Sequence, residues 1–289
     1  MRRSLVFLLI CTVAVPAFGW WATGHQVVAR IAAAHLTPAA RTRISRILEV
    51  PDTPEAIADG LAAASTWADE TKNDTHTGAW HFIDLRLQDA KWDIAKRCPD
   101  DNCAPARIRI FAVELRSHQL DQRWSQLDQL RYLIHFAGDI HQPLHTASDA
   151  DEGGNCELLA TPVGKANNLH ALWDGEIIAE MGLDQRALAA ALQAQIVTLS
   201  EAERDKIIAG RVDDWTWESH ELAIHDIYEP LHIPVERVMF PHSCVSAPEA
   251  ITQLRLAIGE SYVAAMKPVV REQLMKAGLR LAKILNDSL

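Results

Sequence analysis

Apolar residues recur every three or four positions along most of the chain, with polar residues between them. This spacing places the apolar side chains on one face of a helix and predicts a series of amphipathic helices. The helices that we expect span residues 24–36, 54–70, 106–120, 124–140, 168–181, 185–196, 213–228, 249–265 and about 269–285.

Local signals mark where several helices begin. Thr37-Pro38 and Thr53-Pro54 each combine an N-cap residue with a proline at the first helical position. The sequences Ser-Glu-Ala-Glu at 200–203 and Ser-Ala-Pro-Glu at 246–249 fit capping boxes. Each of the four predicts a helix start.

Two long stretches, at residues 71–105 and 142–167, interrupt the helical pattern. Only residues 80–85 read as a strand, and that strand is brief. We therefore expect an all-α fold, a single compact multi-helix domain with long irregular loops. Loops of this length in a compact domain often carry function.

The first 19 residues read as a secretory signal peptide, with an arginine pair, a short apolar core and small residues at the cleavage position. Cleavage is expected before Trp20. The apolar core is too short to span a membrane, and Ile10 is bulkier than lipoprotein processing at Cys11 usually tolerates. Residues 20–289 contain no linker-like segment, fixed-period repeat or further stretch of about 20 apolar residues, so we expect one exported, soluble domain.

Histidines and aspartates recur at spacings that suit metal ligation. His135/Asp139 and His170/Asp174 are i, i+4 pairs, so each pair places an imidazole and a carboxylate one turn apart on one helix face. A proline ends the helix before His145 and turns that histidine toward a different ion. An isolated pair of this kind is usually a surface contact, so the prediction depends on the whole set. The set comprises Trp20-Trp21-Ala22-Thr23-Gly24-His25, Trp67-Ala68-Asp69, Trp80-His81-Phe82-Ile83-Asp84, His135 to His145, and Asn168 to Asp174.

This set, in this order, resembles the ligand motifs of the trinuclear zinc nucleases, the family of single-strand nucleases and 3′-nucleotidases of the S1/P1 type. The resemblance covers essentially the whole chain after residue 19 and implies the helical fold that this family shares with the zinc phospholipases C. It also implies three zinc ions. The first is held by Asp69, His81, His135 and Asp139, the second by the α-amine and carbonyl of Trp20 with His25 and a bridging Asp139, and the third by His145, His170 and Asp174.

The resemblance implies catalytic roles for three residues. Asp69 orients a water placed between the close pair of ions, and Asp139 bridges that pair. Lys72 lies three residues after Asp69, where the family commonly has an arginine that contacts the scissile phosphate. Lysine keeps the charge but loses the planar two-point contact, so rate or substrate preference is expected to differ from that of the better-known members.

A nucleobase pocket is implied as well. Phe82 and Asp84 match the family's aromatic ring, which stacks on a base, and its carboxylate, which accepts from base N–H groups. Gly153, Gly154 and Asn155 are expected to line the same pocket. Stacking tolerates every base because each base has a π-face. The alternative interpretation of the first two residues is a core phenylalanine and a capping aspartate.

The formal net charge of −10 means that the chain lacks the basic surface typical of proteins that bind nucleic acid through its phosphates. Three zinc ions would bring about six positive charges against about three from Asp69, Asp139 and Asp174, since histidine binds metal as neutral imidazole. The surplus of positive charge in one cleft would attract a phosphodiester. The acidic composition therefore does not exclude a nucleic-acid substrate.

Four cysteines follow the signal segment: Cys98, Cys103, Cys156 and Cys244. In an oxidising compartment an even number favours two disulfides, and sequence alone allows three pairings. The family resemblance supports a short-loop bridge between Cys98 and Cys103, and with it a bridge between Cys156 and Cys244. A cysteine-rich zinc site is the alternative, but the His/Asp set already accounts for the metals.

The sequence thus predicts a secreted or periplasmic zinc-dependent phosphodiesterase that cleaves single-stranded DNA and RNA. The resemblance implies 5′-phosphate products and 3′-mononucleotides as further substrates, and no stable protein partner or membrane is implied. A zinc phospholipase C is the nearest alternative. His25 lies only five residues after Trp20, and Asp174 stands where the phospholipases resemble one another in using glutamate.

These two features, with a base-binding Phe82/Asp84 pair, favour the nuclease. A zinc-sequestering protein without turnover is an alternative of another class. It stays open because ligands alone do not prove an open coordination position.

Overall fold

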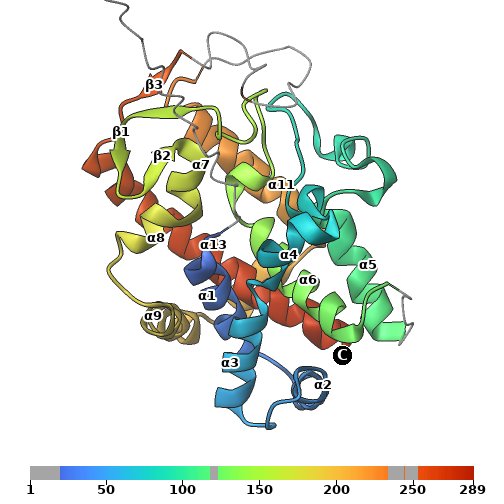
Figure 1. Cartoon of the computed structure of the whole chain (residues 1–289). Coiled ribbons are helices and arrows are strands. Elements are labelled where there is room, and N and C mark those ends of the chain that lie inside the picture. Colours follow the sequence, from blue (N-terminus) through green and yellow to red (C-terminus); the bar gives the residue numbers. More distant parts are fainter. Residues whose placement is uncertain (1–19, 118–122, 234–243, 245–252) are drawn as a thin grey trace, which may run out of the picture.

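The computed structural model describes residues 20–117, 123–233, 244 and 253–289. The expected signal peptide and the capping box at 246–249 lie outside these ranges. Figure 1 shows helices packed together along most of the molecule, with a small sheet at one end. The prediction of a mainly helical single domain is confirmed.

Three helices form the centre of the fold: α1 (Ala22–Ala33), α6 (Gln126–Asp139) and α13 (Glu260–Ser288). α1 packs against α13, and α6 packs against both of them and against α5 (Ala104–Ser117). Each helix buries one face, and that of α1 includes Val27, Val28 and Ile31.

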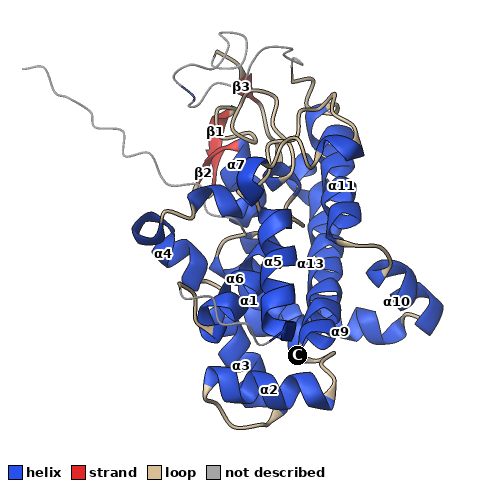
Figure 2. Cartoon of the chain, turned by 90° about the vertical axis from the view of Figure 1, so that its right-hand side faces the viewer, coloured by secondary structure: helices blue, strands red, loops and turns tan. Residues whose placement is uncertain are grey.

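The remaining helices surround this centre (Figure 2). They are α2 (Pro38–Leu48), α3 (Pro54–Ala64), α4 (Trp67–Thr75), α7 (Leu169–Ala171), α8 (Ile177–Ala179), α9 (Gln185–Thr198), α10 (Glu201–Ile208) and α11 (Val212–Leu222). Short π-helical segments at Leu172–Glu176 and Ala223–Tyr228 continue α7 and α11. Turns of 3₁₀ helix lie at Gly78–His81, Lys91–Asp93, Pro99–Asp101 and Pro143–His145.

Three of the expected helix starts are confirmed. The hydroxyls of Thr37 and Thr53 accept hydrogen bonds from the backbone N–H groups three residues later. Ser200 and Glu203 form the expected capping box at the start of α10. These bonds satisfy N–H groups that have no partner within the first turn of a helix.

The single helix expected over residues 54–70 is wrong, because α3 ends before Ser65 and α4 begins at Trp67. The Ser65 carbonyl accepts a hydrogen bond from His135 Nδ1 (2.6 Å), and the Ser65 hydroxyl donates to a carbonyl one turn earlier. Both groups compete with the regular helical ladder at this point. A tertiary contact thus interrupts a segment whose local pattern is helical throughout.

Residues 80–85 do not form the expected strand. The first two belong to a 3₁₀ turn, and the rest form an extended loop in which Ile83 N donates to His145 O (2.8 Å). Ile83 and Leu85 are buried, whereas Phe82 is exposed. The alternating pattern therefore reflects a loop that packs on one side without a neighbouring strand.

A three-stranded sheet that the sequence pattern does not predict lies beside α7 (Figure 1). Strand β1 (Leu158–Val163) pairs antiparallel with β2 (Ala166–Asn168) and parallel with β3 (Arg255–Leu256), in the order β2–β1–β3. The strand β3 contradicts the helix expected over residues 249–265. Strands of two to three residues are too short for a periodicity to reveal them.

The separate last helix expected from about residue 269 is also wrong, because α13 runs continuously through Pro268. Proline removes the backbone hydrogen bond to the carbonyl four residues earlier. Ala264 and Pro268 are both exposed. Water can therefore satisfy that carbonyl, and the helix continues.

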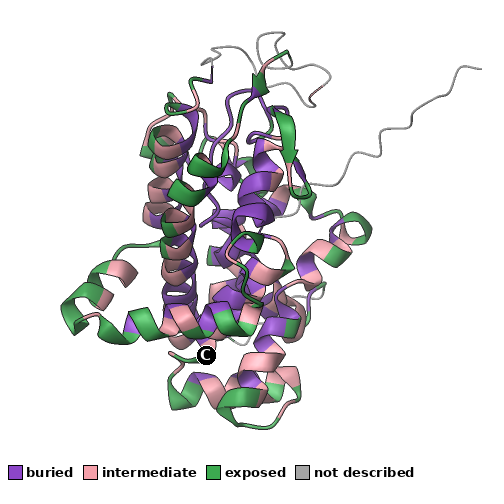
Figure 3. Cartoon of the chain, turned by 90° about the vertical axis from the view of Figure 1, so that its left-hand side faces the viewer, coloured by how far each residue is buried: buried purple, intermediate pink, exposed green. Residues whose placement is uncertain are grey.

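One large apolar core runs through the molecule, as Figure 3 shows by burial. Its fully buried aromatic side chains include Trp20, Phe111, Tyr132, Phe136 and Trp173. Within the described ranges, no helix is both long and apolar enough to cross a membrane. Both expected disulfides, Cys98–Cys103 and Cys156–Cys244, are present.

Candidate metal centre

The structure brings the predicted metal-binding side chains together. They come from the first turns of α1 and α4 (His25, Asp69), the end of α6 (His135, Asp139), two 3₁₀ turns (His81, His145) and the segment from α7 into the following π-helix (His170, Asp174). All of them except Asp69 are buried. Three groups have ligand atoms within 4.8 Å of one another: His25/Asp69/His135, His81/His135/Asp139 and His145/His170/Asp174.

A fourth group, Glu152/Cys156/Cys244, also meets this distance. Its two cysteines are joined in a disulfide. A thiolate is needed to bind metal, so the bonded sulfurs do not suit a cation. The cysteine-rich zinc site considered from the sequence has no support here.

Asp139 lies between the histidines of the first two groups. Its Oδ2 is 3.2 Å from His81 Nδ1 and 3.4 Å from His135 Nε2, and its Oδ1 is 3.4 Å from His25 Nε2. Asp69 Oδ1 lies 3.5 Å from His81 Nδ1. Zinc bonds of about 2.0–2.1 Å in a tetrahedral arrangement hold ligand atoms about 3.3–3.4 Å apart. The observed spacings fit shared coordination better than direct hydrogen bonds.

The third group has the same spacing. His170 Nε2 lies 3.3 Å from Asp174 Oδ2, and His145 Nε2 lies 3.6 Å from Asp174 Oδ1. The expected i, i+4 relation of His170 and Asp174 is therefore realised across the junction of α7 and the π-helix. A carboxylate with each oxygen facing a different imidazole can contribute to one cation held between the three side chains.

Backbone carbonyls orient three of the imidazoles. Nδ1 of His135 contacts Ser65 O (2.6 Å), Nδ1 of His145 contacts His81 O (2.8 Å) and Nδ1 of His170 contacts Gly153 O (2.6 Å). A carbonyl can only accept, so Nδ1 must carry the proton in each contact. In the neutral form of each ring, Nε2 is then unprotonated and faces the aspartates, as metal ligation requires.

Buried atoms without hydrogen-bond partners support a cation at this place. Nε2 of His25, His145 and His170 has no hydrogen bond within the described structure, and neither do the two carboxylate oxygens of Asp139. Unpartnered buried polar atoms are rare because each costs free energy. Zinc favours a set of imidazole nitrogens and carboxylate oxygens. The residues present therefore fit the metal that the family resemblance implies.

The electrostatics of His135 and Asp139 agree with this fit. Burial lowers the pKa of His135 to about 3, so its imidazole is neutral at physiological pH. Burial by itself would raise the pKa of Asp139, but the charge of His135 and the close imidazoles of His25 and His81 hold it well below its usual value. The group thus combines an ionised carboxylate with a neutral imidazole, the protonation states that bind zinc. For His145, burial lowers the pKa, but the nearby Asp174 and Asp139 raise it to about 9, so this ring has to lose a proton when it binds a metal.

Trp20 is anchored next to Asp139. Its indole is fully buried, and Nε1 donates to Gly138 O at 3.1 Å. Gly138 leaves room for α1 against α6, since a β-carbon there would lie 2.8 Å from His25 Nδ1. The side chain of Trp20 thus fixes the start of α1 beside the first two groups.

A cleft of about 740 Å³ opens onto these groups. His81, His145 and His170 line it together with Lys72, Phe82, Asp84, Gly153 and Asn155, whereas Gly154, also expected in the pocket, is not among the lining residues. Phe82 is 38% exposed, which argues against its alternative as a core residue. The cleft volume is within the range typical of small-molecule sites.

Asp84 is half-buried in the wall of the cleft. Burial, with further contributions from the charges of Asp151 and Glu152, raises its pKa to about 6. A carboxyl group with this pKa can accept a hydrogen bond from a base when ionised and donate one when protonated. The environment therefore suits recognition of a polar base edge.

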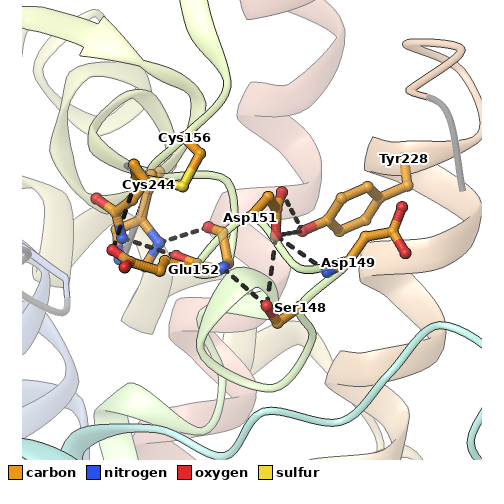
Figure 4. The surroundings of a disulfide bond; sticks show 10 residues. Ser148, Asp149, Asp151, Glu152, Cys156, Tyr228 and Cys244 are labelled. Atoms are coloured by element: carbon orange, nitrogen blue, oxygen red, sulfur yellow. Dashed lines mark hydrogen bonds between the residues drawn. A yellow bond between two sulfur atoms is a disulfide. The ribbon is translucent and has the colours of Figure 1, made fainter. Parts of the chain in front are cut away.

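The turn that carries Gly153 and Asn155 is fixed at both ends. Tyr228 Oη donates to both carboxylate oxygens of Asp151 (2.9 and 3.0 Å), and Cys156 is bonded to Cys244 (Figure 4). Gly153 has a φ of +60°, and a β-carbon there would approach a backbone oxygen at 2.3 Å. Only glycine fits this position. The same turn holds a wall of the cleft and orients His170.

Lys72 lies where the sequence predicts it, on α4 at the cleft wall. It is mostly buried, and its Nζ donates to Asp69 Oδ1 at 3.1 Å. Lys72 is thus in the site and is held beside a predicted metal ligand.

The motifs do not reveal two further parts of the site. Gln142 is buried, donates from Nε2 to Asp174 Oδ1 (2.5 Å) and accepts from a backbone N–H with Oε1. Lys96 and Arg97 line the cleft. The available signals are a glutamine between two predicted ligands and a basic pair close to Cys98, and both are too common to indicate a site.

Comparison with known proteins agrees with this geometry. A model of the S1/P1 nuclease family matches residues 20–289. Endonuclease 3 of Arabidopsis thaliana is 27% identical over 295 residues, covering 99% of this chain and 95% of the relative. Nuclease S1 of Aspergillus oryzae is 29% identical over 207 residues, covering 69% and 68%. Nuclease P1 of Penicillium citrinum is 32% identical over 162 residues, covering 54% and 57%.

The buried His/Asp groups, the cleft and the match over residues 20–289 define a hydrolase that acts on the phosphodiester bonds of nucleic acids. The chain belongs to the S1/P1 nuclease family. The resemblance inferred from the motifs is thereby confirmed.

Proposed function

We propose that the protein is a secreted, zinc-dependent nuclease that hydrolyses single-stranded DNA and RNA to 5′-phosphate products and also dephosphorylates 3′-mononucleotides. The observation that carries this proposal is the shared wall of the cleft. His81, His145 and His170 face the same cavity as Phe82 and Asp84. A nucleotide whose base is held by Phe82 and Asp84 has its 3′-phosphate at the three histidines.

Three zinc ions are proposed, with the Trp20 amine and carbonyl completing the ligands around His25 and Asp139. Zinc, when bound, would lower the pKa of a water molecule toward about 7 and would offset the negative charge of the phosphate. Asp69, the most accessible carboxylate of the set, orients that water. Asp139 holds two groups together because its oxygens face histidines of both.

Lys72 supplies a fixed positive charge near the reacting phosphate. Its Nζ is held by Asp69 at 3.1 Å, and the side chain lines the cleft. A single ammonium makes one strong contact with a phosphate oxygen where a guanidinium would make two. Its contribution to turnover is electrostatic, through the charge that develops on the phosphate.

The order of the cleft supports 5′-phosphate products. Gly153 belongs to the base-binding turn and orients His170 through its carbonyl. The His145/His170/Asp174 group therefore lies on the side of the base and ribose, next to the 3′ oxygen. When this oxygen leaves, the phosphate stays on the 5′ position of the following nucleotide.

Single-stranded substrates follow from the base pocket. A base reaches Phe82 and Asp84 only after leaving its stack and its pairing partner. Unstacking and unpairing cost a few kcal/mol in a duplex and less in a single strand. Stacking on Phe82 recovers about 1–3 kcal/mol for any base, so we propose cleavage with little base preference.

Export is proposed from two observations. Residues 1–19 have the composition of a signal peptide, and two disulfides join all four cysteines after it. Disulfides persist in oxidising compartments. The proposed location is therefore secreted or periplasmic.

One experiment tests the proposal against its alternatives. Protein starting at Trp20 is assayed with single-stranded DNA, duplex DNA, 3′-AMP and phosphatidylcholine vesicles, before and after chelation, and its zinc content is measured. Rapid, chelator-sensitive cleavage of single strands and 3′-AMP is expected. Turnover of the vesicles alone would identify a phospholipase C, and three zinc ions without any turnover would identify a sequestering protein.

A further inference from the structure

One part of the cleft wall has no role in the proposed function. Lys96 and Arg97 line the cavity together with Pro99. The pKa of Arg97 is raised mainly by its hydrogen bonds to Asp89, and in smaller part by the charge of Asp84. Lys96 and Arg97 line the same cleft as Phe82 and Asp84, the residues of the proposed base pocket.

The segment that carries Lys96 and Arg97 is held by contacts at Arg97 and, beyond the disulfide, at Ala104. Arg97 donates from Nε and Nη2 to the two carboxylate oxygens of Asp89 (2.6 and 2.7 Å). A disulfide follows at once, and beyond it Ala104 N donates to Phe82 O at 3.1 Å. Lys96 is therefore carried on a backbone fixed to the base-stacking residue, unlike a lysine on a free loop.

Lys96 differs from the other cations of the cleft. Lys72 is bonded to Asp69, and Arg97 forms a two-point ion pair with Asp89. Lys96 is exposed and makes no hydrogen bond or ion pair within the residues that the structure describes. Its ammonium is available to an anion of the substrate.

The polarity of a nucleic-acid strand indicates which anion this is. When the base lies on Phe82 and Asp84, the 3′-phosphate lies at the histidines. The 5′ oxygen of the same ribose then points away from the histidines. We propose that Lys96 binds the phosphate on the 5′ side of the nucleotide whose base occupies the cleft. This inference rests on the proposed function and specifies its substrate class.

The consequence is a preference between substrates that share the same base and the same scissile bond. An internal nucleotide of a polynucleotide carries a phosphate at its 5′ position, whereas a 3′-mononucleotide does not. Lys96 thus selects polynucleotides and 5′-phosphorylated nucleotides over 3′-mononucleotides. A solvent-accessible ion pair contributes up to about 1 kcal/mol, which corresponds to roughly fivefold in the specificity constant.

The test compares pairs of small substrates that differ only by a 5′-phosphate: 3′-AMP with adenosine 3′,5′-bisphosphate, and ApA with pApA. In wild-type protein at low salt, the 5′-phosphorylated member should have a kcat/KM higher by roughly fivefold. Lys96→Gln should bring this ratio close to one. The ratio of the wild type should also decline as salt is added, because the contact is accessible to counter-ions.

Lys165→Gln is the matched control, because Lys165 is an exposed lysine that does not line the cleft. This variant should keep the wild-type ratio. Equal kcat/KM values for both members of each pair in wild type, or a ratio unchanged by Lys96→Gln, would overturn the assignment.

A binding measurement separates this inference from the proposed function. A 5′-phosphorylated phosphorothioate dinucleotide should bind wild-type protein several-fold more tightly than it binds Lys96→Gln, whether or not it is cleaved. Absence of hydrolysis of all four substrates by the wild type contradicts the proposed function. Equal affinity of both proteins for the dinucleotide contradicts the role of Lys96.

Discussion

Asp139 shows how much of the site depends on a single side chain. Its two oxygens face three histidines at 3.2–3.4 Å, and the residue is fully buried at the end of α6. Neither oxygen has a hydrogen-bond partner within the described structure. A buried, ionised carboxylate in such a position needs compensating positive charge.

We therefore expect Asp139→Asn to be more damaging than any other single substitution in the set. The amide keeps the shape but loses the charge, so zinc content should fall and turnover of single-stranded DNA should drop by about 100-fold or more. Elemental analysis and initial rates measure both effects. Asp205→Asn, on the exposed face of α10, should change neither. Full zinc content with near-normal turnover in Asp139→Asn would remove the bridging role.

Phe82 and Asp84 are proposed to act in recognition, since they line the cleft and belong to none of the three ligand groups. Phe82→Ala and Asp84→Asn should each lower kcat/KM on dinucleotides by roughly ten- to hundredfold, the equivalent of a lost stacking contact of about 1–3 kcal/mol. Zinc content should stay at the wild-type value. Phe82→Trp, which keeps a ring, is the matched variant and should retain most of the activity. Unchanged kinetics in the alanine variant would place the base elsewhere.

Among the structural elements, β1 begins next to a buried carboxyl group, that of Glu157. Glu157 immediately precedes this strand, is fully buried, and has no hydrogen-bond partner for either carboxylate oxygen in the described part of the chain. Burial, with the charges of Asp151 and Asp149, raises its pKa to about 8. The carboxyl group is therefore largely protonated at neutral pH.

This pKa gives a pH-dependent stability with a definite sign. Between the ordinary glutamate pKa of 4.5 and about 8, the folded state holds a proton that the unfolded state has lost. The free energy of unfolding therefore declines as pH rises through this window. Glu157→Gln should remove the decline and be more stable than wild type at pH 9 by about 2–4 kcal/mol.

Urea unfolding of both proteins at pH 5, 7 and 9 measures the difference. Glu49→Gln, on the surface after α2, serves as the control and should follow the wild type at each pH. A difference between wild type and Glu157→Gln that does not grow with pH would show that Glu157 is ionised throughout.

The elements also show where sequence patterns succeed and fail. Capping signals at Thr37, Thr53 and Ser200 predict helix starts because they act within one turn. The division of the helix at Ser65 is invisible locally, since its cause is a hydrogen bond from His135, 70 residues away. The strand β3 is equally hidden, because two residues form a strand only when β1 is beside them.

The same reasoning explains what was predictable in the site. Two i, i+4 pairs and the resemblance of the whole set to the family's motifs identify the eight side chains that the structure brings together. Gln142 contacts Asp174, which is distant in sequence, and Lys96 joins the other cleft residues only through the shared cavity. Such contacts require the fold, so no local motif predicts them.

At the scale of the whole molecule, an acidic protein with a net charge of −10 belongs to a family that acts on polyanions. Three basic side chains, Lys72, Lys96 and Arg97, line the same cleft as the ligand groups, together with the acidic Asp84 and Glu152. Substrate attraction is therefore local, and it is expected to depend on the bound cations as well as on these side chains.

The N-terminus expected at Trp20 after cleavage of the signal peptide gives the prediction at the scale of the whole molecule. If the Trp20 amine ligates zinc, a glycine added before Trp20 replaces a free amine with an amide, a much poorer donor. The variant should bind about one zinc fewer and cleave single-stranded DNA far more slowly. It should still fold, because the anchoring of Trp20 uses its indole and Gly138. Zinc analysis, turnover and thermal unfolding of both forms make the comparison, and equal zinc and equal rate would exclude the terminus from the site.

The carbonyl acceptors of the histidines have a consequence for how the protein can diverge. Every amino acid has a backbone carbonyl, so the partner of His135 is supplied at position 65 by whichever residue stands there. Random substitution at this position can leave the orientation of the imidazole intact as long as the chain path is kept. The support of His135 is thus inherited with the path of the backbone, and lineages can lose all similarity at position 65 while this imidazole keeps its orientation.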